Sequence, residues 1–356
     1  MCILALVIDH ISYNNVQRFY LKNMKPISNV NKCIQTIPKT TISSKNWMND
    51  AKKYKIDLFD LLYPKGTSYK LRIHGVSKHP IYNFLHTYYQ YSFKAIELYS
   101  PGINIILQDA YGDNGINELV SNKYCKYLNN DVYYTPSCIP STTKKEKQHI
   151  TFLKHNHNIL RKTHQRSPFF GCFGMHEWAM VYDPDYSSTT TTTATAEYMN
   201  KYKQQKYLNF RISQSIINNV VSNSNLRCTH FDAWRFFQDD ARIQNKHHLE
   251  RYNQEEYEQP GCIHANMDLF KCATDIYPLI PSTLLLSCLE LAINSRTIDM
   301  RASPYDVSSY SGCEDAIEIE TNIGRQLYIK EQEKIYQQSI PIRHELLMYY
   351  DEILQY

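Results

Sequence analysis

Residues Gly261–Lys271 read GCIHANMDLFK and follow a Gln-Pro turn signal. Apolar residues recur at helical spacing after the glycine, so this stretch predicts a helix over residues 263–276 that ends before Pro278. In such a helix His264 and Asp268 lie four residues apart and share one face. A histidine and an aspartate at that spacing can share a proton, hold one tautomer or bind one cation. They can equally well only cap and solvate the start of a helix.

Helical spacing of apolar residues also dominates the rest of the chain, whereas strand signals are short. Pro and Gly residues mark the ends of these segments. The expected helices cover residues 81–89, 148–164, 282–300 and 322 to near the C-terminus, the last of them interrupted at Pro341. We therefore expect a mostly α protein with a single multi-helical domain over residues 71–356.

Two segments differ in composition from this domain. Residues 1–70 are rich in Asn, Lys, Ser and Thr, and we expect a basic, partly disordered leader. Residues 1–80 hold 13 Lys or Arg against four acidic residues, which suits either a polyanion-binding arm or a solvated leader. Residues 184–207 begin with a Ser/Thr tract and read as a low-complexity loop insertion.

The overall composition excludes several classes of protein. The 43% apolar content of the 356 residues suffices for a core, and a net charge of +4 is too small to imply nucleic-acid binding by itself. The ten cysteines include no Cys-x-x-Cys pair, which disfavours a zinc ribbon and indicates a reducing compartment. The apolar run over residues 2–8 is cut short by Asp9, and no later run could span a bilayer. We expect a soluble intracellular protein, nuclear or cytoplasmic, without a membrane partner.

Gly171–Tyr182 reads GCFGMHEWAMVY and places a histidine and a carboxylate beside a tryptophan. His176 and Glu177 are costly to bury without partners, and adjacent helical residues point in different directions. We therefore expect at most one of them to point into a given site. The alternative is that His176 is a hydrogen-bonded core residue and Glu177 is exposed.

Arg227–Phe237 reads RCTHFDAWRFF. If the segment is extended, His230 and Asp232 share a face, and if it is helical His230 pairs with Trp234. Either arrangement sets a titratable group against an aromatic wall, as a base-stacking pocket requires, or it is an aromatic core strip.

Asp299–Asp306 follows the expected 282–300 helix. Arg301 stands between Asp299 and Asp306, which favours an ion-pair lock for the turn before Pro304. A phosphate clamp is the alternative role for Arg301.

Imidazoles and carboxylates from these stretches could bind one or two metal ions. No two of them fall in an established metal-binding spacing such as His-Glu-x-x-His. The candidate ligands and catalytic residues are His176, Glu177, His230, Asp232, His264 and Asp268.

Four stretches, in this order, resemble a family of bacterial proteins commonly labelled 3-methyladenine DNA glycosylase: Gly171–Tyr182, Leu226–Phe237, Gln259–Lys271 and Leu291–Asp306. Residues His79–Tyr89, Pro101-Gly102 and Glu318–Arg325 fit as well. The resemblance covers roughly residues 79–345 without the insertion.

The resemblance implies an enzyme that removes an alkylated purine such as 3-methyladenine from DNA by base flipping and N-glycosidic hydrolysis, without a cofactor. Trp178 and Trp234 would then stack the base. Asp268 or Asp232, with His264 or His230, would serve the hydrolysis. The remaining candidates for substrate binding are Asn266, Arg235 and Arg301.

The same His and carboxylate set also supports a different enzyme, one that uses a divalent metal such as non-haem Fe, Mn or Zn on a small molecule inside a helical bundle. A non-enzymatic scaffold is the third interpretation. It explains the helices but not the concentration of His and Asp in apolar stretches.

Overall fold

The computed structural model describes residues 40–63, 79–89, 93–110, 125–135, 143–186 and 208–355. Helices dominate these residues, which confirms the mostly α prediction. The predictions for residues 1–39 and for the loop insertion at residues 187–207 lie outside the described residues.

Helices occur along the whole of the described sequence. They are α2 (Ser44–Leu62), α4 (Tyr82–Tyr89), α5 (Phe93–Ile96), α6 (Lys144–Gln165), α7 (Met175–Ala179), α9 (Gln214–Ser222), α10 (Phe231–Trp234), α11 (Asp239–Arg242), the 3-10 turn η3 (Arg251–Asn253), α12 (Gln254–Tyr257), α13 (Ile263–Ile276), α14 (Ser282–Arg301) and α15 (Asn322–Gln355).

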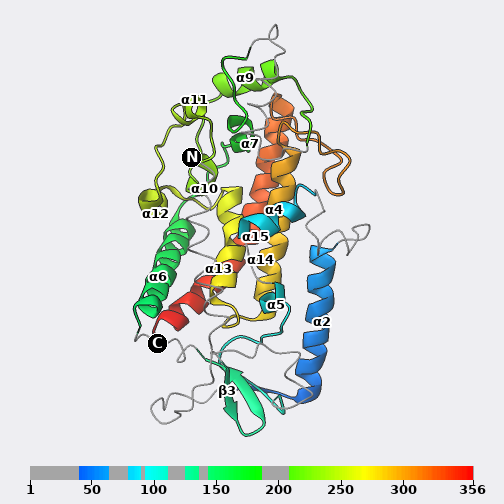
Figure 1. Cartoon of the computed structure of the whole chain (residues 1–356), viewed down its shortest axis with the longest axis vertical. Helices are drawn as coiled ribbons and strands as arrows, with labels where there is room; N and C mark the ends of the chain where they lie inside the picture. Colours follow the sequence, from blue (N-terminus) through cyan, green and yellow to red (C-terminus); the bar gives the residue numbers. More distant parts are fainter. Residues whose placement is uncertain are drawn as a thin grey trace.

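A small sheet lies at the lower end of the molecule in Figure 1. Its strands are β1 (Thr40–Ile42), β2 (Ile105–Leu107), β3 (Cys125–Leu128) and β4 (Asp131–Tyr134), in the order β1-β2-β4-β3. β1 runs parallel to β2, with Thr40 opposite Ile105, and the other two pairs are antiparallel.

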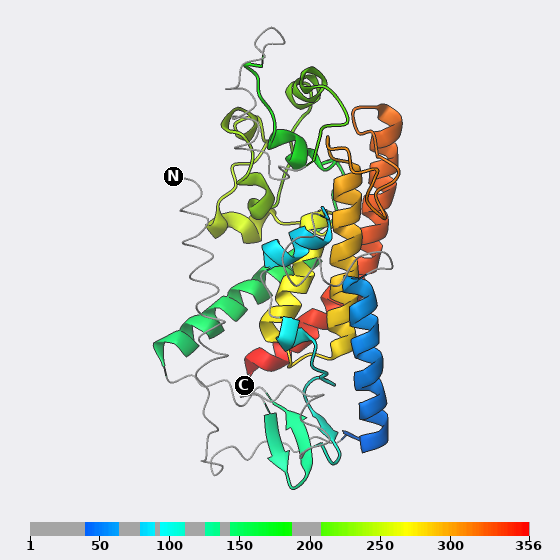
Figure 2. The same ribbon diagram turned by 45° about the vertical axis from the view of Figure 1, so that its right-hand side comes forward.

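Helices α13, α14 and α15 pack against one another and form the centre of the fold. α13 and α14 begin and end close to the residues expected from their Pro and Gly boundaries. α14 buries residues on almost all its sides, as expected of a helix with neighbours all around it. α6 packs against α15, and α2 packs against α14 (Figures 1 and 2).

Helix α2 overturns part of the prediction for the leader. Residues 44–62 form a 19-residue helix instead of partly disordered chain. Its buried residues are Trp47, Ala51, Tyr54, Leu58 and Leu62. Their spacing of three or four residues forms one apolar stripe, which the surrounding lysines obscure in the sequence.

Helix α15 corrects the expected interruption at Pro341. The helix runs on through this residue, although it changes direction along its length (Figures 1 and 2). Pro341 lies on the exposed side. Water can satisfy the carbonyl that loses its intrahelical donor there, so the helix can continue through the proline.

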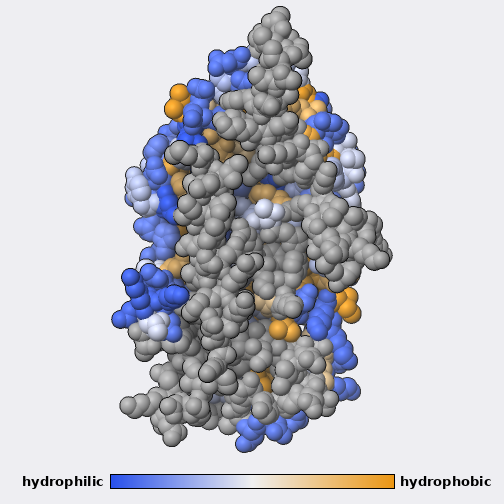
Figure 3. All heavy atoms as spheres, in the orientation of Figure 1, coloured by the Kyte–Doolittle hydropathy of each residue, from blue (hydrophilic) through white to orange (hydrophobic). Residues whose placement is uncertain are grey.

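The described surface offers no large apolar face in the view of Figure 3. Its coloured parts are mostly hydrophilic at the edges, and hydrophobic residues form small separate groups. Within the described ranges, none of the helices combines the length and the apolar character needed to cross a bilayer.

Candidate functional site

Three elements bring their polar side chains together beside the upper part of α14. His176 lies on α7, His264 on the first turn of α13 and Asp299 near the end of α14. One potential ligand atom from each of the three residues lies within 4.8 Å of the other two. The imidazole rings of His176 and His264 meet edge to face, with centroids 4.2 Å apart.

Two glycines allow this approach of α7 to α13. Gly174 precedes α7 with a φ of 65°, a left-handed conformation that favours glycine. A Cβ at Gly261 would lie 2.7 Å from the carbonyl oxygen of Phe169, so a side chain there would push the two segments apart. The amide of Gln259 joins these segments, since its Oε1 accepts from the backbone N–H groups of both Phe169 and Gly261 at 2.8 Å.

A buried guanidinium holds the carboxylates of this site. Arg296 donates through Nη1 to Glu177 Oε1 at 2.7 Å and also to Asp299 Oδ2. Asp299 Oδ2 lies 3.2 Å from His176 Nε2. Arg296 stacks on the ring of Phe84, with Cζ 3.9 Å from its centroid. We call these residues the His176 group: His176, Glu177, His264, Arg296 and Asp299.

The charges of this group shift its pKa values in opposite directions. Burial alone would lower the pKa of His176, but Asp299 and Glu177 outweigh it and raise that pKa to about 9. Burial would raise the pKa of Glu177, which Arg296 and His176 instead lower to about 2. The pKa of His264 falls well below its usual value because the ring is buried and faces His176. His264 is therefore the neutral imidazole of the pair.

Several buried atoms of the His176 group make no hydrogen bond to the described residues. They are Glu177 Oε2, Asp299 Oδ1, and Arg296 Nε and Nη2. Buried polar groups normally have partners, so such a concentration in one place points to a ligand or an ion.

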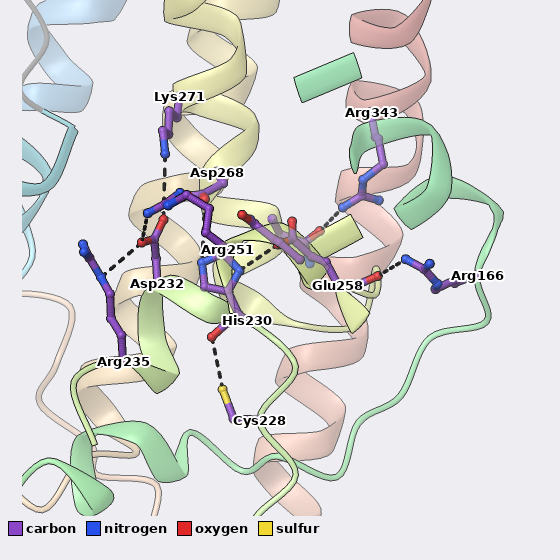
Figure 4. A network of polar contacts seen from close by, with 12 residues as sticks. Arg166, Cys228, His230, Asp232, Arg235, Arg251, Glu258, Asp268, Lys271 and Arg343 are labelled. Atoms are coloured by element: carbon purple, nitrogen blue, oxygen red, sulfur yellow. Dashed lines mark hydrogen bonds and ion pairs between the residues drawn. The ribbon is translucent and has the colours of Figure 1, made fainter. Parts of the chain in front are cut away.

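A second cluster adjoins the first through His264. The ring of His230 stacks on that of His264, with centroids 5.4 Å apart. His230 Nδ1 lies 3.2 Å from Glu258 Oε2, and its Nε2 lies 3.7 Å from Asp268 Oδ2. We call this cluster, with its three cations, the His230 group: His230, Asp232, Arg235, Arg251, Glu258, Asp268 and Lys271 (Figure 4).

Asp232 is the most heavily paired carboxylate of the His230 group. Its Oδ1 contacts Arg251 at 2.9 Å and Arg235 at 3.1 Å, and its Oδ2 lies 3.9 Å from Lys271 (Figure 4). Burial would raise the pKa of Asp232, but these three cations keep it well below its usual value. His230, Asp232 and Asp268 also offer ligand atoms within 4.8 Å of one another, yet built-in cations already neutralise Asp232.

A small cavity of about 20 Å³ opens beside the His176 group, with His176 and His264 among its lining residues. Its volume holds about one water-sized molecule. Three thiols line it as well, those of Cys172, Cys228 and Cys262. Burial raises the pKa of each, that of Cys228 to about 12, so these thiols are neutral in the protein without a bound ion.

The two tryptophans expected to stack a flipped base lie in the core instead. Trp178 is fully buried, and its Nε1 donates to the carbonyl of Ala302 at 2.8 Å. Trp234 is 5% exposed and packs against His248 and Arg242. Neither lines the cavity. Each ring is covered by the fold, so a base has no face on which to stack.

The remaining candidates for substrate binding have structural partners. Asn266 is fully buried, where it donates to Pro260 and accepts from Arg343. Arg235 pairs with Asp232. Arg301 was expected to form a lock with Asp299 and Asp306, and this is wrong. It donates to the carbonyl of Asp315, while Asp299 is held by Arg296.

Sequence reasoning missed Arg296, Asp299 as a site residue, and Glu258. The signal for the first two was present, since Arg296 and Asp299 stand three apart on one helix and so share a face. Glu258 follows the short helix α12 and carried no pattern of its own.

No family model, curated protein or solved structure matches the chain.

Proposed function

We propose that the chain is a metal-dependent enzyme for a small molecule, with one divalent ion held by His176, His264 and Asp299. The observation that carries the proposal is the convergence of these three ligands, from three separate elements, within 4.8 Å of one another. Unpaired buried oxygens on Glu177 and Asp299 support it.

The donor set fits a transition metal. Two imidazoles and one carboxylate on one side of an ion leave its other positions open, an arrangement suited to Fe(II), Mn(II) or Zn(II). The remaining residues supply the outer contacts that such sites need. Arg296 orients the carboxylate of Asp299, and Glu177 fixes Arg296 in turn.

The bound ion would activate a water or another small ligand as a Lewis acid, which serves hydrolytic or oxygen-dependent chemistry. The chain's own residues contribute the surroundings. The 20 Å³ cavity limits what reaches His176 and His264 to about one water-sized group at a time. Buried apolar neighbours such as Met175, Ile263 and Phe237 keep bulk water away from that space.

Removal of an alkylated purine from DNA stays a prediction of the family resemblance alone. The burial of Trp178 and Trp234 gives it no support from the site. An excision assay on alkylated duplex DNA, with a catalytically competent glycosylase as positive control, checks it directly.

The metal proposal is tested by elemental analysis of protein purified without a His tag from medium supplemented with Fe, Mn and Zn. We expect close to one ion per chain in the unmodified protein and a loss of nearly all of it in His264→Ala. His248→Ala is the matched control, because His248 is an exposed histidine that pairs with Glu250 and packs against Trp234. Absence of metal from the unmodified protein, or equal metal in all three, would reject the site.

A further inference from the structure

Tyr328 lines the same cavity as His176 and His264. It lies on α15, which supplies none of the three proposed metal ligands, and its side chain is fully buried. Its hydroxyl end lies against another lining residue, since a Cβ at Gly174 would come within 3.3 Å of the Tyr328 oxygen. Helix α15 therefore brings a phenol hydroxyl to the wall of the cavity.

This hydroxyl has no strong hydrogen bond within the part of the chain that the structure describes. No nitrogen or oxygen atom there serves as its partner. Its polar neighbour is the thiol of Cys172, and a thiol is a weak hydrogen-bonding group. A phenol ionises only near about pH 10, so at neutral pH the side chain offers a proton that the described fold leaves weakly used.

Gln332 fixes α15 one turn after Tyr328. Its amide donates to the carbonyl of Gly261 at 2.6 Å and to Cys172 Sγ at 3.4 Å. Gly261 and Cys172 belong to the segments that lead into α13 and α7, the two helices that carry the imidazoles. Residues four apart share a helix face, so these bonds also hold Tyr328 in place beside both helices.

The cavity of about 20 Å³ has room for about one water-sized molecule, and a buried water normally has about three polar partners. An ion held by the proposed ligands would be one of them. Arg227 and Thr229 line the cavity as well, but both are partly exposed and bulk water can satisfy them. The hydroxyl of Tyr328 is buried and has no such alternative.

We propose that Tyr328 donates a hydrogen bond to the water-sized molecule at the open position of the ion, and so orients this molecule for reaction. This inference rests on the proposed function. A donor in that place stabilises negative charge on the molecule, so it favours hydroxide over neutral water.

Fluoride tests this role, because it resembles hydroxide in size and charge and accepts hydrogen bonds. The Co(II)-loaded protein is titrated with sodium fluoride at neutral pH, and the visible spectrum of Co(II) follows binding. Tyr328→Phe removes only the hydroxyl, so it should take up Co(II) as the unmodified protein does. It should bind fluoride about tenfold more weakly or worse, the effect of one lost hydrogen bond to a charged group.

Tyr350→Phe is the matched control. Tyr350 is also fully buried on α15, and its hydroxyl donates to the carbonyl of Cys272 at 3.0 Å. Its fluoride affinity should equal that of the unmodified protein. If Tyr328→Phe does not fold, Tyr328→Leu takes its place, because it also lacks the hydroxyl.

Unchanged fluoride affinity in Co(II)-loaded Tyr328→Phe, or no fluoride binding by the loaded unmodified protein, would overturn the role of Tyr328 and leave the metal site in place. Loss of Co(II) from a folded Tyr328→Phe would make the phenol a ligand of the ion, which also overturns the proposal. If the unmodified protein binds no Co(II), the metal site itself fails, and the role of Tyr328 fails with it.

Discussion

The His176 group and the His230 group contain the same kinds of side chain but differ in how their charges are balanced. In the His176 group two carboxylates, Glu177 and Asp299, share one guanidinium. The His230 group has three carboxylates and three permanent cations: Arg235, Arg251 and Lys271 all pair with Asp232, while Glu258 and Asp268 contact His230. His176, whose pKa is about 9 without a bound ion, completes the charge balance of the first group when it is protonated. Only the first group has a deficit of positive charge once its histidines are neutral, and a divalent cation that displaces the proton of His176 meets that deficit.

Closeness of potential ligands alone is a weaker indication of a metal site than closeness combined with a deficit of positive charge. Both groups offer a histidine and carboxylates within 4.8 Å. An ion near Asp232 would have to displace or approach Lys271 and two arginines, at a Coulombic cost that is large in a buried site. We interpret the His230 group as a structural ion cluster whose His230 ring stacks on His264 and helps to hold it in place.

The largest expected effect is on the free energy of unfolding, when one guanidinium is removed from each group in turn. Arg296→Met leaves Glu177 and Asp299 buried without their cation and should destabilise the metal-free protein by about 3–5 kcal/mol. Arg251→Met should cost less than about 1 kcal/mol, because Arg251 is half-exposed and Asp232 keeps two other cations. Urea unfolding measures both.

If both variants lost the same free energy of unfolding, this would contradict the different roles assigned to the His176 group and the His230 group. If Arg296→Met does not yield folded protein, Arg296→Lys keeps the charge but loses the fork that reaches both carboxylates. The free energy of unfolding of Arg296→Lys should therefore be lower than that of the unmodified protein and that of Arg251→Met, but the variant should still fold.

A smaller effect is expected from the carboxylate that holds Arg296. Glu177→Gln keeps the shape of the side chain but removes its charge, so Arg296 and with it Asp299 lose their fixed orientation. The affinity for Zn(II), measured by competition with a chromophoric chelator, should fall about tenfold. Glu258→Gln makes the same change in the His230 group and should leave that affinity within about twofold. A reversed order of the two variants would show that the ion belongs to the other group.

A further effect concerns the pH dependence of stability in the His230 group. Asp232 has a lowered pKa in the folded state, so its ion pairs stabilise the fold above its unfolded pKa of about 3.9, and that contribution disappears as the pH falls through the lower folded value. Asp232→Asn should therefore be less stable than the unmodified protein by about 2 kcal/mol at pH 6. The difference should shrink progressively below about pH 4. A difference that grows with acidification would contradict the pairing of Asp232 with cations.

Much of the fold could be predicted because helix boundaries and helix faces are local properties. The limits of α13 and the start of α14 follow from Pro260-Gly261, Pro278 and Pro281. Helix α2 was missed because its stripe is interspersed with lysines, and packing against α14 rather than composition orders it. The continuation of α15 through Pro341 depends on which side of the helix faces solvent, a tertiary property.

The candidate site could be predicted only in part. His176 and His264 were found because they stand out in apolar stretches, but their partner Asp299 was paired with Arg301 by closeness in sequence. On a helix, residues two apart point in different directions, whereas Arg296 and Asp299, three apart, lie on the same face. The contact of Glu177 with Arg296 joins residues 119 positions apart, and no local pattern in one sequence reveals such a pair.

The most direct test of the central claim compares the metal content of two aspartate variants, Asp299→Asn and Asp268→Asn, in untagged protein dialysed against a metal-free buffer. Each change removes one carboxylate charge from one group and keeps the side-chain shape. The account predicts about one ion per chain in the unmodified protein and in Asp268→Asn, and nearly none in Asp299→Asn. Metal that is lost from Asp268→Asn but kept by Asp299→Asn would contradict it.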